Sequence, residues 1–412
     1  MFVQIHMLQS MPPGNLNRDD MGQPKKCIFG GVTRGRISSQ CLKRNIRWSI
    51  EFKEVFGEAR SCNTTYLPGM VAKEVRKLKP RISDDDLGKI KLALAAKFKG
   101  ESTKSQTQNV EQSDESEARP QKSSAKSDAT DQTGQLVRFP PPFARSIAEL
   151  IVGLPENVYT AWIKGKKKDM EEHKKEIRDF EEKILEKSKC LTVDIGLFGR
   201  MTTSDLVVNV EAACQVAHAI STHETLIESD YFTAMDDKKR EFATTQTEQA
   251  GAAFLGSGET ETFFNSAVYY KYLNLDVDAL KNHLSWQDEE TAGAAGVFLR
   301  AASRNNPTGK QNSFAAHGVP ELILVEVSKP KWPISYANAF LKPVEGLNLM
   351  TESAAALREY IHSVVAAFEP PDVRRVLLAV GSASVDIRQA ERVDTLDNLV
   401  DSLVRLLKGV TA

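Results

Sequence analysis

LNRDDMGQPKKCIFGGVTRGRISSQCLKRNIRW, from Leu16 to Trp48, concentrates cations and glycines just before the start of a helix. The stretch carries eight cationic side chains against the carboxylates of Asp19 and Asp20, whereas the formal net charge of the 412-residue chain is -1. The cations are Arg18, Lys25, Lys26, Arg34, Arg36, Lys43, Arg44 and Arg47. Positive charge gathered in one stretch of a nearly neutral protein predicts a surface that meets a polyanion.

A helix start follows the glycine pair of this stretch. Ser38 or Ser39 is a natural N-cap, and it leaves backbone N–H groups of the first turn free to face an anion. The spacing of apolar residues predicts one helix over residues 40–56. One side of that helix packs on the protein, while Lys43 and Arg47 lie together on another side and face the polyanion.

Two other interpretations stay open for these features. Basic helix faces are commonly just solvated, and a Gly-Gly pair often marks a tight turn without a ligand. Neither a P-loop nor the glycine fingerprint of a dinucleotide-binding fold occurs in this stretch. A nucleic-acid backbone is therefore favoured over a nucleotide.

Further motifs follow along the chain: DIGLFGRM (194–201), QVAHAISTHE (215–224), DYFTAMDD (230–237), PTGKQNSFA (307–315) and SYANAF (335–340). Together with LNRDD, IFGG and RISSQ-LKR they resemble, in the same order, the motifs of the CasC family. CasC is the guide-RNA-binding backbone subunit of the type I-E CRISPR Cascade complex. The resemblance covers both ends of the chain, and the middle from about Arg60 to Lys189 matches poorly.

The residue pattern predicts an α+β protein whose sheet is built from both ends of the chain. Strands are predicted at 2–9, half-buried, and at 322–327 and 376–380, with helices at 352–368 and 396–407. In the middle, helices are predicted at 84–98 and 142–162 and a charged helix at 164–189. The polar tract 100–135 has almost no large apolar residue, so we expect it to be disordered.

The resemblance implies a more detailed architecture. It implies a ferredoxin-like, RRM-type palm with an inserted helical lobe, often compared with fingers, and a long hairpin-like thumb. The palm would comprise residues 1–59, 190–227 and 263–412, the helical lobe residues 60–189, and the thumb residues 228–262. The aromatic signature of an ordinary RRM is absent, so RNA stacking across the open sheet is not predicted.

The resemblance also implies which residues contact guide RNA. These are Arg18, Lys25, Arg34, Arg36, Ser38, Gln40, Lys43, Arg44, Arg47, Met201 and Lys310. Tyr231 and Phe232 would lie at the foot of the thumb and wedge between bases, where an aromatic contact is worth about 1 to 3 kcal/mol per stacked base. From the residues alone, packing of Tyr231 and Phe232 against the palm is the more frequent outcome, and a methionine such as Met201 ordinarily fills a core.

The sequence offers little support for catalysis or a metal. His218 and His223 are five residues apart and no HExxH occurs beside them, so we expect no metal site. Asp19 and Asp20 lie in the cationic loop and could help to cleave RNA, as a loop aspartate does in backbone subunits of type III effectors. The type I-E motifs favour a non-catalytic protein in which both aspartates pair with arginines and cap the turn. A loop-aspartate ribonuclease and a stand-alone single-stranded RNA-binding protein remain alternatives.

Composition and termini set the expected compartment. The five cysteines are scattered and lack CxxC spacing, which argues against a disulfide framework or a zinc site. The N-terminus lacks the pattern of a signal peptide, and no apolar run is long enough to span a bilayer. We therefore expect a soluble cytoplasmic protein without a cofactor. Its implied partners are CRISPR guide RNA (crRNA), target DNA through guide pairing, copies of itself arranged head to tail, and the large, small, cap and guide-processing Cascade subunits.

Overall fold

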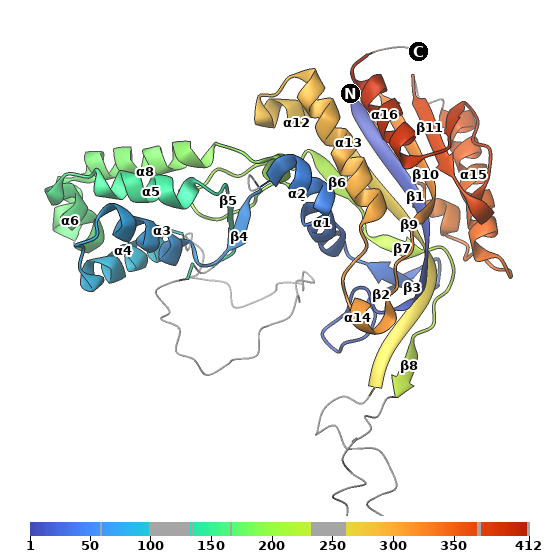
Figure 1. Ribbon diagram of the computed structural model, residues 1–412, viewed down its shortest axis with the longest axis horizontal. Coiled ribbons are helices and arrows are strands. Elements are labelled where there is room, and N and C mark those ends of the chain that lie inside the picture. The colour runs from blue at the N-terminus through green and yellow to red at the C-terminus, as the bar shows by residue number, and fades with distance from the viewer. Residues whose placement is uncertain are drawn as a thin grey trace, which may run out of the picture.

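The fold consists of a large mixed sheet with helices on both faces and a helical lobe that extends from it (Figure 1). The computed structural model describes residues 1–57, 60–98, 132–133, 135–164, 167–231, 261–368 and 372–409. Within these ranges the mixture of helices and strands confirms the α+β class predicted from the sequence. Most of the polar tract 100–135 and residues 232–260 lie outside the described residues.

The large sheet runs in the order β12-β11-β10-β1-β9-β7-β3-β2, and β6 and β8 pair with other stretches of β9. Its strands are β1 (Phe2–Gly14), β2 (Lys26–Phe29), β3 (Val32–Ile37), β6 (Cys214–Val216), β7 (Ala219–Ser221), β8 (Glu228–Tyr231), β9 (Glu261–Asp276), β10 (Pro320–Ser328), β11 (Arg374–Ala379) and β12 (Ala390–Val393). Neighbouring strands are antiparallel except β11 and β12, which are parallel. Strands from the two ends of the chain therefore pair directly, since β1 lies between β9 and β10.

One face of the sheet is covered by helices that share its apolar core. Ile5 of β1 lies opposite Leu273 of β9 and Val325 of β10, and all three side chains enter this core. The helices of this region are α1 (Ser39–Arg47), α2 (Ile50–Phe56), α9 (Val193–Phe198), α12 (Val277–Leu284), α13 (Asp288–Arg304) and α16 (Leu396–Leu407), and the short α14 (Gln311–Phe314) lies near β1. The sequence predicted α16 at the bounds that the structure shows.

The other face is covered by α15 (Leu349–Phe368), with the 3-10 turns η2 (Tyr336–Phe340) and η3 (Gly381–Ala383) beside it. Strand β1 is therefore buried on both sides, and the prediction of a half-buried strand was wrong. The alternation of apolar and polar residues in β1 is real, but Gln4 and His6 point into a second core instead of into solvent.

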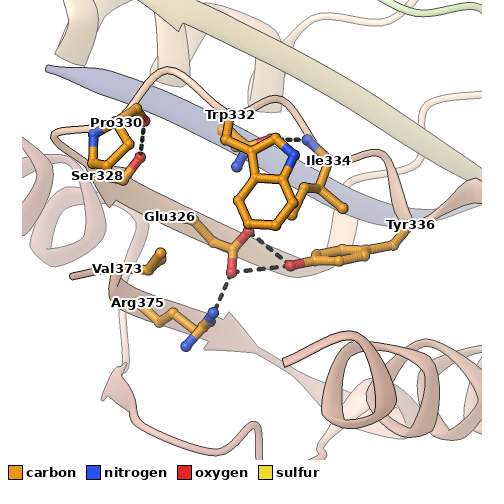
Figure 2. A pocket seen from close by; sticks show the side chains of 9 residues that line it. Glu326, Ser328, Pro330, Trp332, Ile334, Tyr336, Val373 and Arg375 are labelled. Atoms are coloured by element: carbon orange, nitrogen blue, oxygen red, sulfur yellow. Dashed lines mark hydrogen bonds and ion pairs between the residues drawn. The ribbon is translucent and has the colours of Figure 1, made fainter. Parts of the chain in front are cut away.

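A hydrogen-bonded polar cluster lies inside this second core. His6 Nε2 lies 3.3 Å from Glu326 Oε2, and Arg375 Nε donates to Glu326 Oε1 at 2.6 Å. The Tyr336 hydroxyl donates to the same carboxylate at 3.0 Å, and Figure 2 shows Tyr336 and Arg375 converging on Glu326. Burial alone would raise the pKa of Glu326, but the hydrogen bonds and charges of His6 and Arg375 outweigh burial and hold that pKa below its ordinary value.

The helical lobe has a core of its own. Its elements are β4 (Cys62–Thr64), α3 (Leu67–Leu78), α4 (Asp84–Lys97), β5 (Val137–Phe139), α5 (Phe143–Val152), α6 (Glu156–Lys164), α7 (Lys167–Glu172) and α8 (Lys174–Ser188). The antiparallel pair β4–β5 forms the neck between the lobe and the large sheet (Figure 1). The single helix predicted over 142–162 is in fact two, because Gly153 and Pro155 interrupt it between α5 and α6. The charged segment 164–189 is likewise divided into α7 and α8.

We predict that Glu326→Gln destabilises the fold by about 3 to 5 kcal/mol at neutral pH, because Arg375 then stays buried without its charge partner. Glu326 has a lowered pKa in the folded state, so its stabilising effect is present above the ordinary carboxyl pKa and is lost as the pH falls through the lowered value. Urea denaturation measured by circular dichroism at several pH values tests both points.

The matched control is Glu149→Gln, which removes an exposed carboxylate that accepts from Arg145 Nε at 3.0 Å. This variant should change the unfolding free energy by less than about 1 kcal/mol. Equal effects of the two substitutions would contradict the assignment of Glu326 as a buried charge partner.

Candidate nucleic-acid interface

The loop that carries LNRDD folds onto the first turn of α1. Asn17 Oδ1 accepts a hydrogen bond from Ser38 N at 2.8 Å, and Ser38 Oγ in turn accepts from Cys41 N at 3.3 Å. Ser38 is thus the N-cap of α1, as one of the two predicted candidates. Its side chain is committed to capping and is 4% exposed, so the first turn presents neighbouring groups rather than the Ser38 hydroxyl to a ligand.

The two aspartates of this loop have a structural role in part. Asp19 Oδ1 accepts hydrogen bonds from Met21 N at 3.0 Å and Gln23 N at 2.9 Å, so Asp19 caps the turn as predicted. The expected ion pairs with arginines do not form within the described part of the chain, where neither Asp19 nor Asp20 lies within 4.0 Å of a guanidinium nitrogen.

The glycine pair forms the turn between β2 and β3. Gly30 and Gly31 have φ angles of 63° and 83°, in the left-handed region that favours glycine. A Cβ atom at Gly30 would also lie 1.7 Å from the carbonyl oxygen of Leu341. The tight-turn interpretation therefore explains Gly30 without a ligand.

The predicted basic helix is divided in two. Ser49 caps α2 by accepting from Phe52 N at 3.2 Å, so the chain breaks at Trp48 between α1 and α2. Gln40 and Arg44 of α1 are exposed, and Lys43 is half-buried. The N-terminal end of α1 and its exposed cationic side therefore lie beside the LNRDD loop, where Arg18 is also exposed.

Arg34 was predicted to bind RNA, and the structure corrects this. Its side chain is 0% exposed, and its guanidinium group donates to three backbone carbonyls: Phe29 O at 3.1 Å, Ser221 O at 3.1 Å and Phe340 O at 2.8 Å. Arg34 thus joins the β2–β3 turn to segments distant in sequence. Arg36 shares its side of β3 but is half-buried, with Nη1 lying 3.1 Å from His218 Nδ1.

Arg47 is the second correction. It is 8% exposed, and Nε donates to Asp194 Oδ2 at 2.5 Å while Nη2 donates to Ser61 O. Asp194 also accepts from Ser61 N at 3.0 Å and from the Thr192 hydroxyl at 2.6 Å. Burial would raise the pKa of Asp194, but these hydrogen bonds, from Ser61, Thr192 and Arg47, hold it below its ordinary value. Arg47 therefore joins α1 to the neck, and its buried guanidinium group is not accessible to a ligand.

Two predicted cations from distant parts of the chain meet near the start of β9. Arg18 and Lys310 both line a hollow of about 310 Å³, together with Met21, Phe263 and Glu261. The turn that carries Lys310 packs closely on the LNRDD loop, because a Cβ atom at Gly309 would lie 2.5 Å from Leu16 O. The PTGK turn and the LNRDD loop therefore support each other.

The remaining predicted residues lie in other segments, and one of them lies outside the described part of the chain. Met201 is 92% exposed, so it does not fill a core in this chain. Tyr231, at the end of β8, is 67% exposed. Phe232 lies outside the described residues. Lys25 is half-buried at the end of the LNRDD loop, where Lys25 N donates to Asn17 O at 2.8 Å.

Histidines and acidic groups form no candidate metal centre in the parts of the chain that the structure describes. His223 lies within the fold, where its Nε2 accepts from Val268 N at 3.2 Å. In the same residues, no helix combines the length and apolar character needed to cross a bilayer.

Comparison with known proteins gives the family. A family model described as CT1975-like protein matches residues 3–402. The chain belongs to the CT1975-like protein family. A comparison with curated proteins gives no significant match. The span of this match includes the helical lobe, which the sequence motifs did not cover.

Solved structures resemble this CT1975-like protein along nearly its whole length. A chain from a structure described as "CRISPR RNA-guided surveillance complex, pre-nicking" matches with a TM-score of 0.71 and 25% identity, covering 99% of this chain and 100% of that one. A chain from another, described as "CRISPR RNA-guided surveillance complex", matches with a TM-score of 0.66 and 23% identity, covering 98% and 100%. At 23% identity, the second match shows a likeness of fold alone.

We predict that Arg47→Gln lowers the thermal unfolding temperature strongly, because Asp194 then stays buried without its guanidinium partner, at a cost of about 3 to 5 kcal/mol. Arg44→Gln, which removes an exposed cation from the same helix, should change stability by no more than about 0.5 kcal/mol. Thermal unfolding followed by circular dichroism compares the two. Equal unfolding temperatures would show that the Arg47–Asp194 pair does not hold the neck.

Proposed function

We propose that this protein is a guide-RNA-binding subunit of a CRISPR surveillance complex. The observation that carries this proposal is the match, over 99% of the chain, to a chain of a CRISPR RNA-guided surveillance complex. The exposed cations support it, because a chain of contacts joins Lys310, Arg18 and the LNRDD loop to the start of α1. Phosphates of single-stranded RNA are suited to such a cationic surface without regard to sequence.

Within this role, we place the protein as the backbone subunit of a type I-E Cascade complex. The ordered CasC-like motifs support that assignment. Several copies would polymerise head to tail along crRNA, because a heterologous contact that does not close generates a helical filament. Its partners would be crRNA, further copies, and the large, small, cap and guide-processing subunits, in the cytoplasm. Target DNA would be read by base pairing with the guide.

The proposed palm is ferredoxin-like. The strands β10, β1, β9 and β7 are adjacent in that order and antiparallel, while α1 and α13 both pack on one face. This arrangement fits the split β-α-β order of that fold. The thumb would start from β8 and β9 and include residues 232–260, and residues 60–189 would form the finger-like lobe.

RNA binding would use the exposed part of the predicted set. Arg18, Lys310 and Arg44 would contact phosphates, with Lys25, Arg36, Gln40 and Lys43 beside them. Met201 and Tyr231 would contact bases, and the exposure of both side chains supports this role. Arg34 and Arg47 would act only by shaping the surface.

We propose that the protein is not an enzyme. The turn-capping role of Asp19 gives that carboxylate a reason to be present without catalysis. The loop-aspartate ribonuclease stays as the alternative, because Asp20 is exposed beside Arg18. A stand-alone single-stranded RNA-binding protein is a further alternative that would need no ordered multimer.

We expect the protein to co-purify, from cells that express a CRISPR array, with repeat-derived RNA of guide length on curved filaments. Sequencing of the bound RNA and negative-stain imaging measure this. RNA that is cut at regular intervals, and that stays intact in an Asp19→Ala, Asp20→Ala variant, would favour the ribonuclease. Heterogeneous RNA on monomers would favour the stand-alone binder.

We also predict that changing Lys43 and Arg44 together to Ala weakens RNA binding at every sequence. The slope of log affinity against log salt should become shallower by about 1.4, since each lost phosphate contact on a single strand contributes about 0.7. Filter binding of single-stranded RNA at several salt concentrations measures both effects.

The matched control changes Lys174 and Arg178 to Ala, two cations that are each 79% exposed on α8 of the helical lobe. This pair should leave affinity and slope nearly unchanged. If the α1 variant behaves like the α8 variant, α1 is not part of the interface.

A further inference from the structure

The neck of the helical lobe contains a hollow, and Met201 is the only residue of its lining to which the function proposed above gives a role. It has a volume of about 370 Å³ and is formed where the β4–β5 pair meets the segment that follows α9. Its lining includes Asn63, Leu136, Arg138, Phe198, Met201 and Val210. Arg138 lies in β5 directly opposite Asn63 of β4, so the strand pairing fixes its place at the hollow.

The neck carries more buried positive than negative charge among the described residues. Arg47 and Arg138 both interact with the carboxylate of Asp194, which is already paired with Arg47, and Arg200 lies within reach of the charge of Arg138. Burial, and then the charge of Arg47, lower the pKa of Arg138. Burial, and then the charge of Arg138, lower the pKa of Arg200 to about 10. An anion in the hollow would relieve this repulsion.

Of the two arginines that line the hollow, Arg138 is the one with nitrogens to spare. Arg200 donates to Val208 O at 2.8 Å, to Arg138 O at 3.3 Å and to Ser188 O at 2.8 Å, which occupies all three of its nitrogens. Arg138 donates from Nη1 to Gly199 O at 3.2 Å, and this is the one acceptor that its guanidinium reaches within the described part of the chain. Its other N–H groups are available to a ligand.

The rim of the hollow shows what kind of ligand fits. Met201 is 92% exposed and Leu136 is 60% exposed, so two apolar side chains stand unburied beside a guanidinium group. A nucleotide presents this combination, because its phosphate suits the cation and its sugar and base present apolar surface. An acidic protein side chain would meet the cation but leave Met201 and Leu136 exposed.

We propose that Arg138 binds a backbone phosphate of RNA in this hollow, with Met201 and Leu136 against the adjoining sugar or base. The inference rests on the guide-RNA role proposed above and extends the phosphate contacts from α1 to the neck. The neck is continuous with α1, because Arg47 joins α1 to Asp194 and to Ser61, one residue before β4. The hollow is therefore held in place relative to the α1 cations.

The experiment compares Arg138→Gln with Arg145→Gln in the full-length protein, using single-stranded RNA at several salt concentrations. Arg145 is 66% exposed on α5 and pairs only with Glu149 among the described residues, so it is a matched loss of one charge from the same lobe. Arg138→Gln should bind RNA more weakly at every salt concentration, with a slope shallower by about 0.7 for one lost phosphate. Arg145→Gln should match the wild type.

Arg138→Lys serves as a second variant in case Arg138→Gln fails to fold, and it should keep the slope because it keeps the charge. Thermal unfolding of all variants separates folding from binding. If Arg138→Lys loses RNA binding and thermal stability together, Arg138 is only a support for Gly199 and the inference is overturned. The same holds if Arg138→Gln binds RNA as Arg145→Gln does.

Two further outcomes keep the inference distinct from the function on which it rests. If the wild type binds no RNA, the guide-RNA role fails and the inference fails with it. If Lys43→Ala with Arg44→Ala weakens RNA binding while Arg138→Gln does not, the inference alone fails. A loss confined to capture of target single-stranded DNA by the RNA-loaded protein would assign the phosphate to the target strand and overturn the RNA assignment.

Discussion

The pairing of β9 with its neighbours is the constraint on which the rest of the structure depends. This 16-residue strand pairs with β1 along one edge and with β6, β7 and β8 along the other. Because side chains alternate between faces, this register sends Leu273 to the core under α1 and α13, and Tyr270 to the core under α15. A slip of one residue in this register would move the side chains of β9 that now enter one core to the opposite face of the sheet, and the other way round.

Arginine has two different roles in this protein, and the difference matters for function. Arg34, Arg47 and Arg200 are buried, and each holds backbone or carboxylate groups from segments far apart in the chain. They lend rigidity to the basic region without adding to its surface charge. A polyanion can therefore reach fewer cations than the eight that the basic stretch contains. The exposed cations lie along a surface that runs from Lys310, past Arg18, to Arg44.

Local signals were enough to predict elements whose cores are themselves local. The apolar spacing at 396–407 predicted α16, and the Ser-Ser pair predicted the cap of α1. Features that depend on distant partners could not be predicted in this way. His6 is buried because Glu326 lies 3.3 Å away, 320 residues later, and Arg34 is buried while Arg36 on the same side of β3 is not. Asp194 begins the DIGLFGRM motif, yet nothing in the local sequence marks it as the partner of Arg47.

The path of β9 also has a mechanical consequence. The strand pairs with β8 near Glu261 and continues into the middle of the large sheet (Figure 1). Hydrogen bonds in an antiparallel ladder lie perpendicular to the strands, so a pull along β9 loads many of them at once, in shear. A pull across the strand would break them one after another. The protein therefore resists a force applied at the Glu261 end along the axis of β9 better than a force applied perpendicular to that axis.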